Sequence, residues 1–379
     1  MTMKRRDFIR ISGMATLGSA TQAGQAFQAA KSGQVSEEEK GRHPILEKDL
    51  PYIFIDSCMQ IWPDADFDNA HRHGVTAYAV TAWDPHIPLD QALEGLMFWH
   101  LIARRYPNIV IATRADDIQR AKKDRLAALI LASQCGDFID YKLHRIEAFY
   151  RLGLRLLILA YSATNNLCDG CLDRTEGGLT SFGQRVVEEC NRVGLLLDCS
   201  HLGRRSSLEI IERSAQPVIF SHSGVKALAD NPRNIDDQQI KACAARGGVI
   251  GLSPWGPMVL KKGSTRRPTL EEFVGHIDHV AQLLGSTDHI GIGTDMSLGT
   301  YPDHIPDVWG GAAYRDVTGS YDEHISANIR SPLRMVEGFS NYAEVLNLIA
   351  ELKKRGYGEA DIRKILGGNC LRLFKEVWK

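Results

Sequence analysis

Eight short apolar runs alternate with amphipathic segments between residues 45 and 379, and this order predicts a single (β/α)8 barrel of the TIM type. The runs are apolar along their whole length rather than at alternate positions, which is typical of parallel strands buried on both faces. No linker composition divides the chain. We therefore expect one domain over 45–379, although 379 residues would be long enough for two.

The predicted strands lie at 52–57, 75–83, 127–134, 154–162, 194–201, 217–223, 247–254 and 289–295. Segments with helical periodicity lie between them, at 89–105, 178–193, 204–214, 234–246 and 269–285. Thr269 and Glu272 have the spacing of a capping box, which places a helix start there. The stretch from 296 to about 340 is too long for an ordinary connection, so we expect a functional loop at the active-site mouth.

The first thirty residues predict an export signal. Lys4, Arg5 and Arg6 precede a weakly apolar stretch, and the Arg pair followed by Phe8 resembles a twin-arginine signal. The alternative is an ordinary basic amphipathic N-terminus. Because no later stretch of 18 apolar residues follows, we expect no membrane span and a periplasmic or secreted protein.

Charge and cysteine content narrow the classes of partner. Lys plus Arg (45) nearly equals Asp plus Glu (46), so nucleic acid is not expected and a small-molecule substrate is favoured. The eight cysteines do not form a disulfide framework in a chain this long. Cys168 and Cys171 lie in a loop, where a local disulfide or two thiols are favoured over a metal site.

Two apolar runs, "LLLDCSH" and "VIFSHSG", end on the same pair, Ser200–His201 and Ser221–His222. In a barrel of this type the carboxyl ends of the strands meet on one face, and neighbouring strands lie ~5 Å apart, so two imidazoles can share one metal ion. Asp295 ends the eighth run and should face the same mouth. One such His would more often be a cap or loop residue, but the three together favour metal binding or catalysis.

The ordered series of motifs resembles the renal or membrane dipeptidase family of zinc metallopeptidases, from about residue 50 to 379. The similar stretches are "NNLCDG", "GLTSFGQRVVEECNRVGLLLDCSH", "PVIFSHSGVKALADNPRNIDDQQIKACAARGGVIGL", "GHIDHVAQLLGSTDHIGIGTD" and "GGNCLRLF". The resemblance implies a barrel with a binuclear zinc centre that cleaves dipeptides. It implies that His201 and His222 hold one zinc ion, that Arg233 and Asn166 bind substrate, and that Asp295 is the acid of the last strand. It also allows a homodimer.

Three positions depart from the family pattern. The usual His-x-Asp of the first strand is replaced by Cys58 and Gln60, the bridging Glu by Gln134, and a substrate-polarising His by Tyr161. A neutral amide is a poor ligand and cannot neutralise two dications. We therefore expect one zinc ion, with Cys58 or Gln134 as a third neighbour of the histidines, and leave a second ion open.

These residues suggest a hydrolase that cleaves a dipeptide or related small amide by a zinc-activated water. Asp295 would handle the proton, Arg233 would bind the carboxylate and Tyr161 would stabilise the oxyanion. Two alternatives stay open: a barrel enzyme with altered chemistry on a secreted metabolite, and a catalytically silent binding protein. Nothing in the residues identifies the substrate or the metal.

Several of these residues also have plainer interpretations. Arg233 could instead form a surface ion pair with Asp236 or Asp237. His276 and His279 are expected to be packing or surface residues of an outer helix rather than ligands. Asp56, near the end of the first strand, is a carboxylate without an assigned role.

Overall fold

The computed structural model describes residues 49–61, 65–66, 68–83, 85–261, 264, 266–299 and 334–379. The expected export signal over 1–30 and most of the expected loop at 296–340 lie outside these residues. The described part contains the complete set of predicted barrel strands and the segments that carry the candidate site residues.

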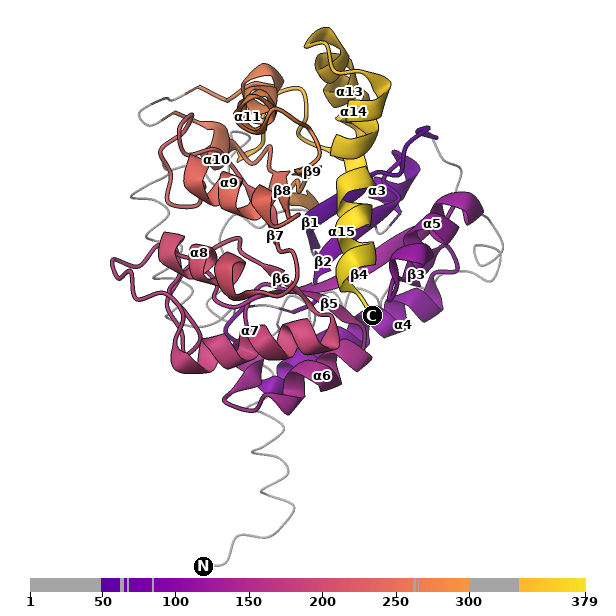
Figure 1. The fold of residues 1–379 in the computed structure, drawn as a ribbon. Coiled ribbons are helices and arrows are strands. Elements are labelled where there is room, and N and C mark those ends of the chain that lie inside the picture. The colour runs from indigo at the N-terminus through magenta and orange to yellow at the C-terminus, as the bar shows by residue number, and fades with distance from the viewer. Residues whose placement is uncertain are drawn as a thin grey trace, which may run out of the picture.

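Eight parallel strands close into the predicted barrel (Figure 1). They follow one another around it in chain order, and the last pairs with the first through Ile292 and Asp56. Their residues are almost all buried, which explains the continuous apolar runs. The strands are β1 (Ile55–Ile61), β2 (Ala77–Thr81), β4 (Ala127–Ser133), β5 (Leu154–Ile158), β6 (Leu196–Asp198), β7 (Ile219–Ser223), β8 (Val249–Leu252) and β9 (Ile290–Ile292).

Two short strands were not predicted from the sequence. Within the described residues, β3 (Ile109–Ile111) pairs with β4, and β10 (Met296–Leu298) pairs with β1. The β10 pairing holds β1 in extended conformation as far as Ile61. Cys58 and Gln60 therefore lie within the first strand rather than after it, and Met296–Leu298 form a strand rather than the start of the expected loop.

Helices surround the barrel, and the five predicted ones are found. They are α4 (Leu89–Arg105), α7 (Ser181–Val193), α8 (Arg204–Arg213), α9 (Asp237–Ala245) and α11 (Leu270–Leu284). Thr180, Asp236 and Thr269 cap three of them, the last two as capping boxes. The described residues also form α3 (Asn69–Arg72), α5 (Ala115–Asp124), α6 (His144–Arg151), α10 (Gly256–Val259), α13 (Val345–Lys354), α14 (Glu359–Arg363) and α15 (Asn369–Val377).

The C-terminal helix α15 covers the amino ends of the strands, and Figure 1 shows it lying across the barrel. Its apolar side chains Leu373 and Phe374 belong to one buried cluster with the first residues of several strands, among them Ile55, Ile219 and Val249. This packing closes one end of the barrel. The carboxyl ends of the strands are left to build a site, as in other barrels of this class.

A buried serine joins three strands inside the barrel. Ser57 donates its hydroxyl hydrogen bond to the carbonyl oxygens of Ser221 (2.6 Å) or Ile292 (2.9 Å). Gly293 permits this approach, because a Cβ at that position would lie 1.8 Å from the Ser221 oxygen. The contact sets the spacing of β1, β7 and β9, the strands that carry or precede Cys58, His222 and Asp295.

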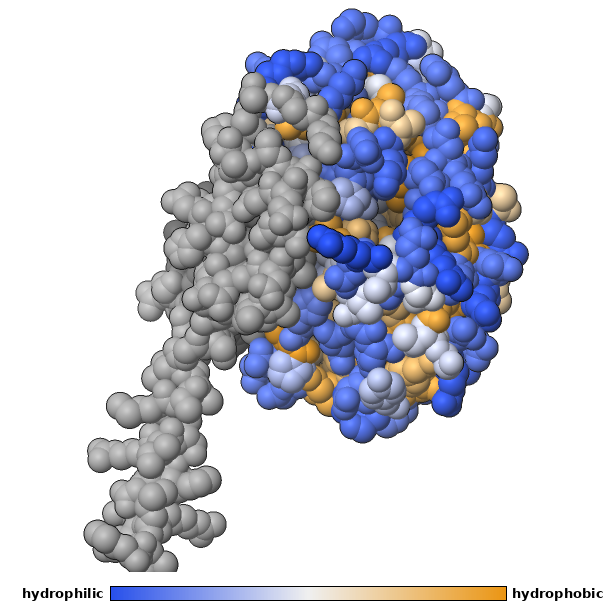
Figure 2. All heavy atoms as spheres, turned by 90° about the vertical axis from the view of Figure 1, so that its left-hand side faces the viewer, coloured by the Kyte–Doolittle hydropathy of each residue, from blue (hydrophilic) through white to orange (hydrophobic). Residues whose placement is uncertain are grey.

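The described surface is mostly polar. On the face shown in Figure 2, hydrophobic residues lie between larger hydrophilic areas. The exposed large apolar side chains are Met97, Leu101, Tyr141, Leu152 and Leu346. Of the helices that the structure describes, none combines the length and apolarity needed to cross a membrane.

Candidate active site

His201 and His222 meet at the carboxyl ends of two neighbouring strands. His201 follows β6 in a left-handed turn (φ 65°), and His222 lies within β7. Both side chains are buried, and their Nε2 atoms are 2.8 Å apart. The structure therefore brings the two predicted imidazoles together with the same ring nitrogen facing inward.

A serine hydroxyl holds the other nitrogen of each ring. Ser162 is 2.7 Å from Nδ1 of His201, and Ser221 is 2.7 Å from Nδ1 of His222. Burial and the nearby Arg233 charge lower the pKa of both histidines well below the usual value, so both rings are neutral at pH 7. When each Nδ1 carries its hydrogen, two Nε2 lone pairs face each other, an arrangement that suits a cation.

Asp198 links the ends of the two strands near which these histidines lie. Its buried carboxylate accepts hydrogen bonds from the backbone N–H of Ser200 (2.9 Å) and Ser221 (3.0 Å). The Ser200 hydroxyl accepts the N–H of His222 (3.1 Å) and lies 3.3 Å from the Ser221 hydroxyl. The repeated Ser-His pair thus has a structural cause: the serines link the two strand ends.

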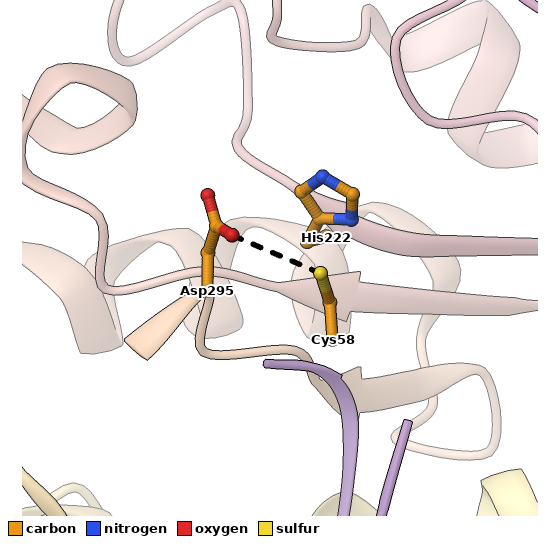
Figure 3. A group of neighbouring side chains, drawn as sticks. All are labelled: Cys58, His222 and Asp295. Atoms are coloured by element: carbon orange, nitrogen blue, oxygen red, sulfur yellow. Dashed lines mark hydrogen bonds between the residues drawn. The ribbon is translucent and has the colours of Figure 1, made fainter. Parts of the chain in front are cut away.

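Cys58 and Asp295 lie beside His222, and Figure 3 shows the three side chains around one small space. Each offers one ligand atom, and these atoms lie within 4.8 Å of one another. The Cys58 thiol is 3.8 Å from Oδ1 of Asp295. Burial raises the pKa of Asp295 and raises that of the Cys58 thiol well above the usual value. Without a cation, the thiol therefore keeps its proton.

Two glutamine amides contact this group as hydrogen-bond donors. Nε2 of Gln60 donates to Oδ1 of Asp295 (2.8 Å), and Nε2 of Gln134 donates to the sulfur of Cys58 (3.4 Å). Each amide therefore turns its N–H group, not its oxygen, toward the prospective ligand. This orientation supports Cys58 rather than Gln134 as the neighbour of the histidines.

Tyr161 and Arg233 border the histidine pair. The Tyr161 ring stacks on His201 with ring centres 4.2 Å apart. Arg233 is buried, and its Nη2 donates to the carbonyl oxygen of His222 (3.4 Å). A cavity of about 150 Å³ is lined by His201 and Arg233, whereas His222, Cys58 and Asp295 do not line it.

The surface interpretation of Arg233 was wrong. Asp236 pairs with Arg204, and Asp237 pairs with His279. Arg233 is therefore held inside, where its charge can act on the site.

Asn166 is not shown to join this group. It is half-buried in the loop after β5, where its carbonyl oxygen accepts a hydrogen bond from Thr180 (2.8 Å). Its neighbour Asn165 makes the polar side-chain contacts, with Asp137 among others. A role of Asn166 in substrate binding stays a prediction.

Asp56 has a positioning role that the sequence did not indicate. One carboxylate oxygen accepts the N–H groups of Cys58 (3.1 Å) and Thr294 (2.8 Å). The other accepts the hydroxyls of Thr294 (2.5 Å) and Tyr342 (2.8 Å). Burial raises its pKa to about 6. Asp56 thus ties the strand that carries Cys58 to the turn that carries Asp295.

The state of the cysteines and the packing of His276 agree with the sequence predictions. All eight cysteines, each within the described residues, are free thiols, so Cys168 and Cys171 are not joined by a disulfide. His276 is a buried packing residue of α11 whose Nδ1 accepts the N–H of Val225 (2.9 Å).

Comparisons with known proteins identify the family and the fold. The model of the membrane dipeptidase family (peptidase family M19) matches residues 68–319 and 315–379. Dipeptidase 3 of Rattus norvegicus is 28% identical over 312 residues, which cover 78% of this chain and 55% of that protein. The chain thus spans about half the length of this curated relative.

Solved structures show the same fold. An amidohydrolase from Pseudomonas aeruginosa superposes with a TM-score of 0.74 and 29% identity, covering 86% of this chain and 97% of that one. A metallo peptidase from Rhodobacter sphaeroides, liganded with a phosphinate mimic of the dipeptide L-Ala-D-Ala, gives 0.69 and 21%, covering 86% and 99%. The family match, together with the convergence of the strand-end histidines, shows that this chain belongs to the membrane dipeptidase family.

Proposed function

We propose that this chain is a metal-dependent hydrolase that cleaves the amide bond of a dipeptide or a related small amide, with one zinc ion held by His201 and His222. The observation that carries the proposal is the pair of neutral imidazoles whose Nε2 atoms face each other at 2.8 Å beside Asp295. Cys58 is the additional ligand available. A bound zinc ion supplies a Lewis acid and lowers the pKa of its water.

Asp295 is the proposed proton carrier. It is buried at the site, and burial raises its pKa above the usual value. Nε2 of Gln60 donates to Oδ1 (2.8 Å), which orients the carboxylate. We infer that Asp295 accepts a proton from the attacking water and returns it to the leaving amine.

Arg233 and Tyr161 are proposed to bind the substrate. The buried guanidinium lines the cavity next to His201 and suits the carboxylate of a dipeptide, because charge-assisted contacts are stronger when shielded from water. Tyr161, stacked on His201, takes the place of the family's polarising His and donates to the oxyanion. Asn166 remains a further candidate contact from the family resemblance.

The orientation of the two glutamines supports one ion rather than two at this centre. A second dication would need oxygen ligands from Gln60 and Gln134, but their Nε2 groups donate to Asp295 and Cys58. Neither amide brings negative charge. The same substitutions favour the second candidate function, a barrel enzyme with altered chemistry.

Metal analysis of the purified chain tests the zinc site. His201→Ala and His222→Ala should each lose one zinc ion per chain relative to wild type, measured by plasma mass spectrometry. His279→Ala is the matched control, because it removes an imidazole on α11 that pairs with Asp237 and does not belong to this group. Unchanged zinc in both histidine variants would overturn the site.

Turnover tests the reaction. Dipeptide hydrolysis should stop with a chelator and return with zinc, and Asp295→Asn should lower kcat by about 10²- to 10⁴-fold. A phosphinate dipeptide mimic serves as the binding probe. Zinc and probe binding without hydrolysis of any dipeptide would favour altered chemistry or a silent binding protein.

We also propose that the chain is exported by the twin-arginine route, on the basis of Arg5 and Arg6. Cell fractionation of wild type and of the Arg5→Lys, Arg6→Lys double variant tests this. The variant should stay in the cytoplasm, and equal export of both would refute the proposal.

The homodimer allowed by the family resemblance is a further proposal. Light scattering after size exclusion tests it, and a mass of one chain at assay concentration would reject it.

A further inference from the structure

A second group of metal-ligand side chains lies one step around the barrel from the proposed zinc site. It consists of His86, which follows β2, and Cys135 and Asp137, which follow β4. One ligand atom from each lies within 4.8 Å of the others. Within the described part of the chain, none of the three forms a hydrogen bond with Cys58, His201, His222 or Asp295. Tyr161 separates the groups, with its ring 6.3 Å from that of His86 and 4.2 Å from that of His201.

Both acidic partners approach the same nitrogen of His86. Nδ1 lies 3.0 Å from Oδ2 of Asp137 and 3.8 Å from the sulfur of Cys135. A Cys-His-Asp catalytic triad needs the thiol and the carboxylate on opposite ring nitrogens, so that one orients the ring while the other receives its proton. This geometry therefore excludes a triad. The N–H group at Nδ1 can form a good hydrogen bond with only one of its two partners, Asp137 or Cys135. One cation, in contrast, could bind the nitrogen, the sulfur and the carboxylate oxygen together.

The distances are close to those of a tetrahedral zinc site. Bonds of about 2.0 Å to nitrogen and oxygen and about 2.3 Å to sulfur give ligand separations of about 3.3 Å for N···O and about 3.6 Å for N···S. The observed 3.0 and 3.8 Å differ from these by a few tenths of an ångström. Rotation of the side chains is enough to make up that difference.

Asn165 fixes the carboxylate in the way that outer partners hold metal ligands. Its Nδ2 donates to Oδ1 of Asp137 (2.7 Å), which leaves Oδ2 directed at His86. Asn165 is itself held by the carbonyl oxygen of Leu159 (2.8 Å) and by the N–H of Leu167 (2.9 Å). Such outer contacts orient the ligand before the metal arrives and raise affinity.

Charge and burial also suit a divalent cation. A thiolate and a carboxylate carry two negative charges, which one dication neutralises, while the imidazole binds as a neutral ligand. Cys135 is buried, whereas 28% of the Asp137 side chain is exposed, which gives a path for the ion. The two contacts of the His86 ring to Asp137 and Cys135 are made by Nδ1. Its other nitrogen, Nε2, is buried and has no hydrogen-bond partner among the described residues.

We propose that His86, Cys135 and Asp137 form a second, separate site for one thiophilic divalent cation such as zinc, with a fourth position open to water. Binding releases the thiol proton and the proton on Nδ1 of His86. Because Gln134 and Tyr161 neighbour this site, a cation there would fix two residues at the edge of the proposed active site. The ion would thus brace the loops after β2 and β4.

Cobalt titration of the full chain tests the site, because a thiolate on Co²⁺ gives a charge-transfer band in the near ultraviolet. Cys58 could give a similar band, so the titration is done with Cys58→Ser. We expect a band that rises to a plateau as Co²⁺ is added and disappears when Cys135→Ser is added. Cys171→Ser, which changes a partly exposed thiol outside this group, is the control and should keep the band.

Two further variants guard against misfolding of the Cys135 variant. Asp137→Asn keeps the shape of the side chain, and His86→Asn suits the left-handed backbone there (φ 62°). Both variants should have the circular dichroism spectrum of the folded parent protein. Their affinity for cobalt should be at least tenfold lower. A band that survives the loss of Cys135, or no band in Cys58→Ser at tenfold excess cobalt, would overturn the site.

Zinc analysis is a second test, and it should show one ion fewer per chain in Cys135→Ser than in wild type. Loss of this ion is independent of the ion lost in His201→Ala.

Discussion

His276 should make the stability of this protein depend on pH. The side chain is buried in α11, and burial lowers its pKa from 6.5 to about 4. Its Nδ1 accepts the N–H of Val225, three residues after His222, so the neutral ring holds the end of β7. Protonation would remove this acceptor and place a charge in the core.

The sign and size of the effect follow from the pKa. Because the folded state disfavours the protonated form, His276 contributes stability that is present above pH 6.5 and is lost as the pH falls toward 4. Each pKa unit corresponds to about 1.4 kcal/mol. The loss should be about 2 kcal/mol at pH 5 and about 3 kcal/mol once the pH is below 4.

The assay is urea unfolding of wild type and His276→Asn at pH 7 and pH 5, with a chelator present. Asn keeps an acceptor near the Nδ1 position but does not titrate. The variant should be less stable at pH 7, because it leaves a gap, yet should lose about 2 kcal/mol less than wild type on moving to pH 5. Protonation of His201 and His222 also lowers the stability in acid, but it does so equally in wild type and in His276→Asn. His279→Asn, on the same helix, should retain most of the wild-type loss. An equal loss in wild type and His276→Asn would refute the reasoning.

Three changes at the candidate site give further predictions. Ser162→Ala removes the Nδ1 partner of His201 and should weaken zinc binding by about 10- to 100-fold in a chelator competition, with little change in thermal stability; unaltered affinity would show that the serine does not orient the ring. Arg233→Lys should raise KM for a dipeptide but not for its C-terminally amidated form, since only the former has a carboxylate to bind; an equal effect on both substrates would remove Arg233 from carboxylate binding. Tyr161→Phe should lower kcat by about 10²-fold at nearly constant KM, and a change in KM alone would argue against oxyanion stabilisation.

The order of the barrel strands could be predicted because a doubly buried parallel strand leaves a clear sequence signal. All eight runs became strands, and the two Ser-His pairs fell at neighbouring strand ends. The short strands β3 and β10 left no comparable signal. Three residues are too few to show periodicity, and β10 forms only because β1 is beside it.

The partners of the site residues could not be predicted, because they come from distant parts of the chain. Ser162 reaches His201 from the loop after β5, and Tyr342 reaches Asp56 across 286 residues. Serine, threonine and tyrosine are common in any loop, so their types carry no signal without the fold. The His86 group was missed for the same reason, since His86 and Cys135 are 49 residues apart.

The substituted residues also bear on how charge is balanced around the proposed zinc ion. One dication, a Cys58 thiolate and the Asp295 carboxylate sum to zero when both histidines are neutral. Arg233 is the proposed partner of the substrate carboxylate, and its burial would strengthen that contact. A second dication would meet only the amides of Gln60 and Gln134, which already donate to Asp295 and Cys58. We therefore infer that the exchange of acidic and histidine ligands for amides and a thiol changes the proposed centre from two ions to one.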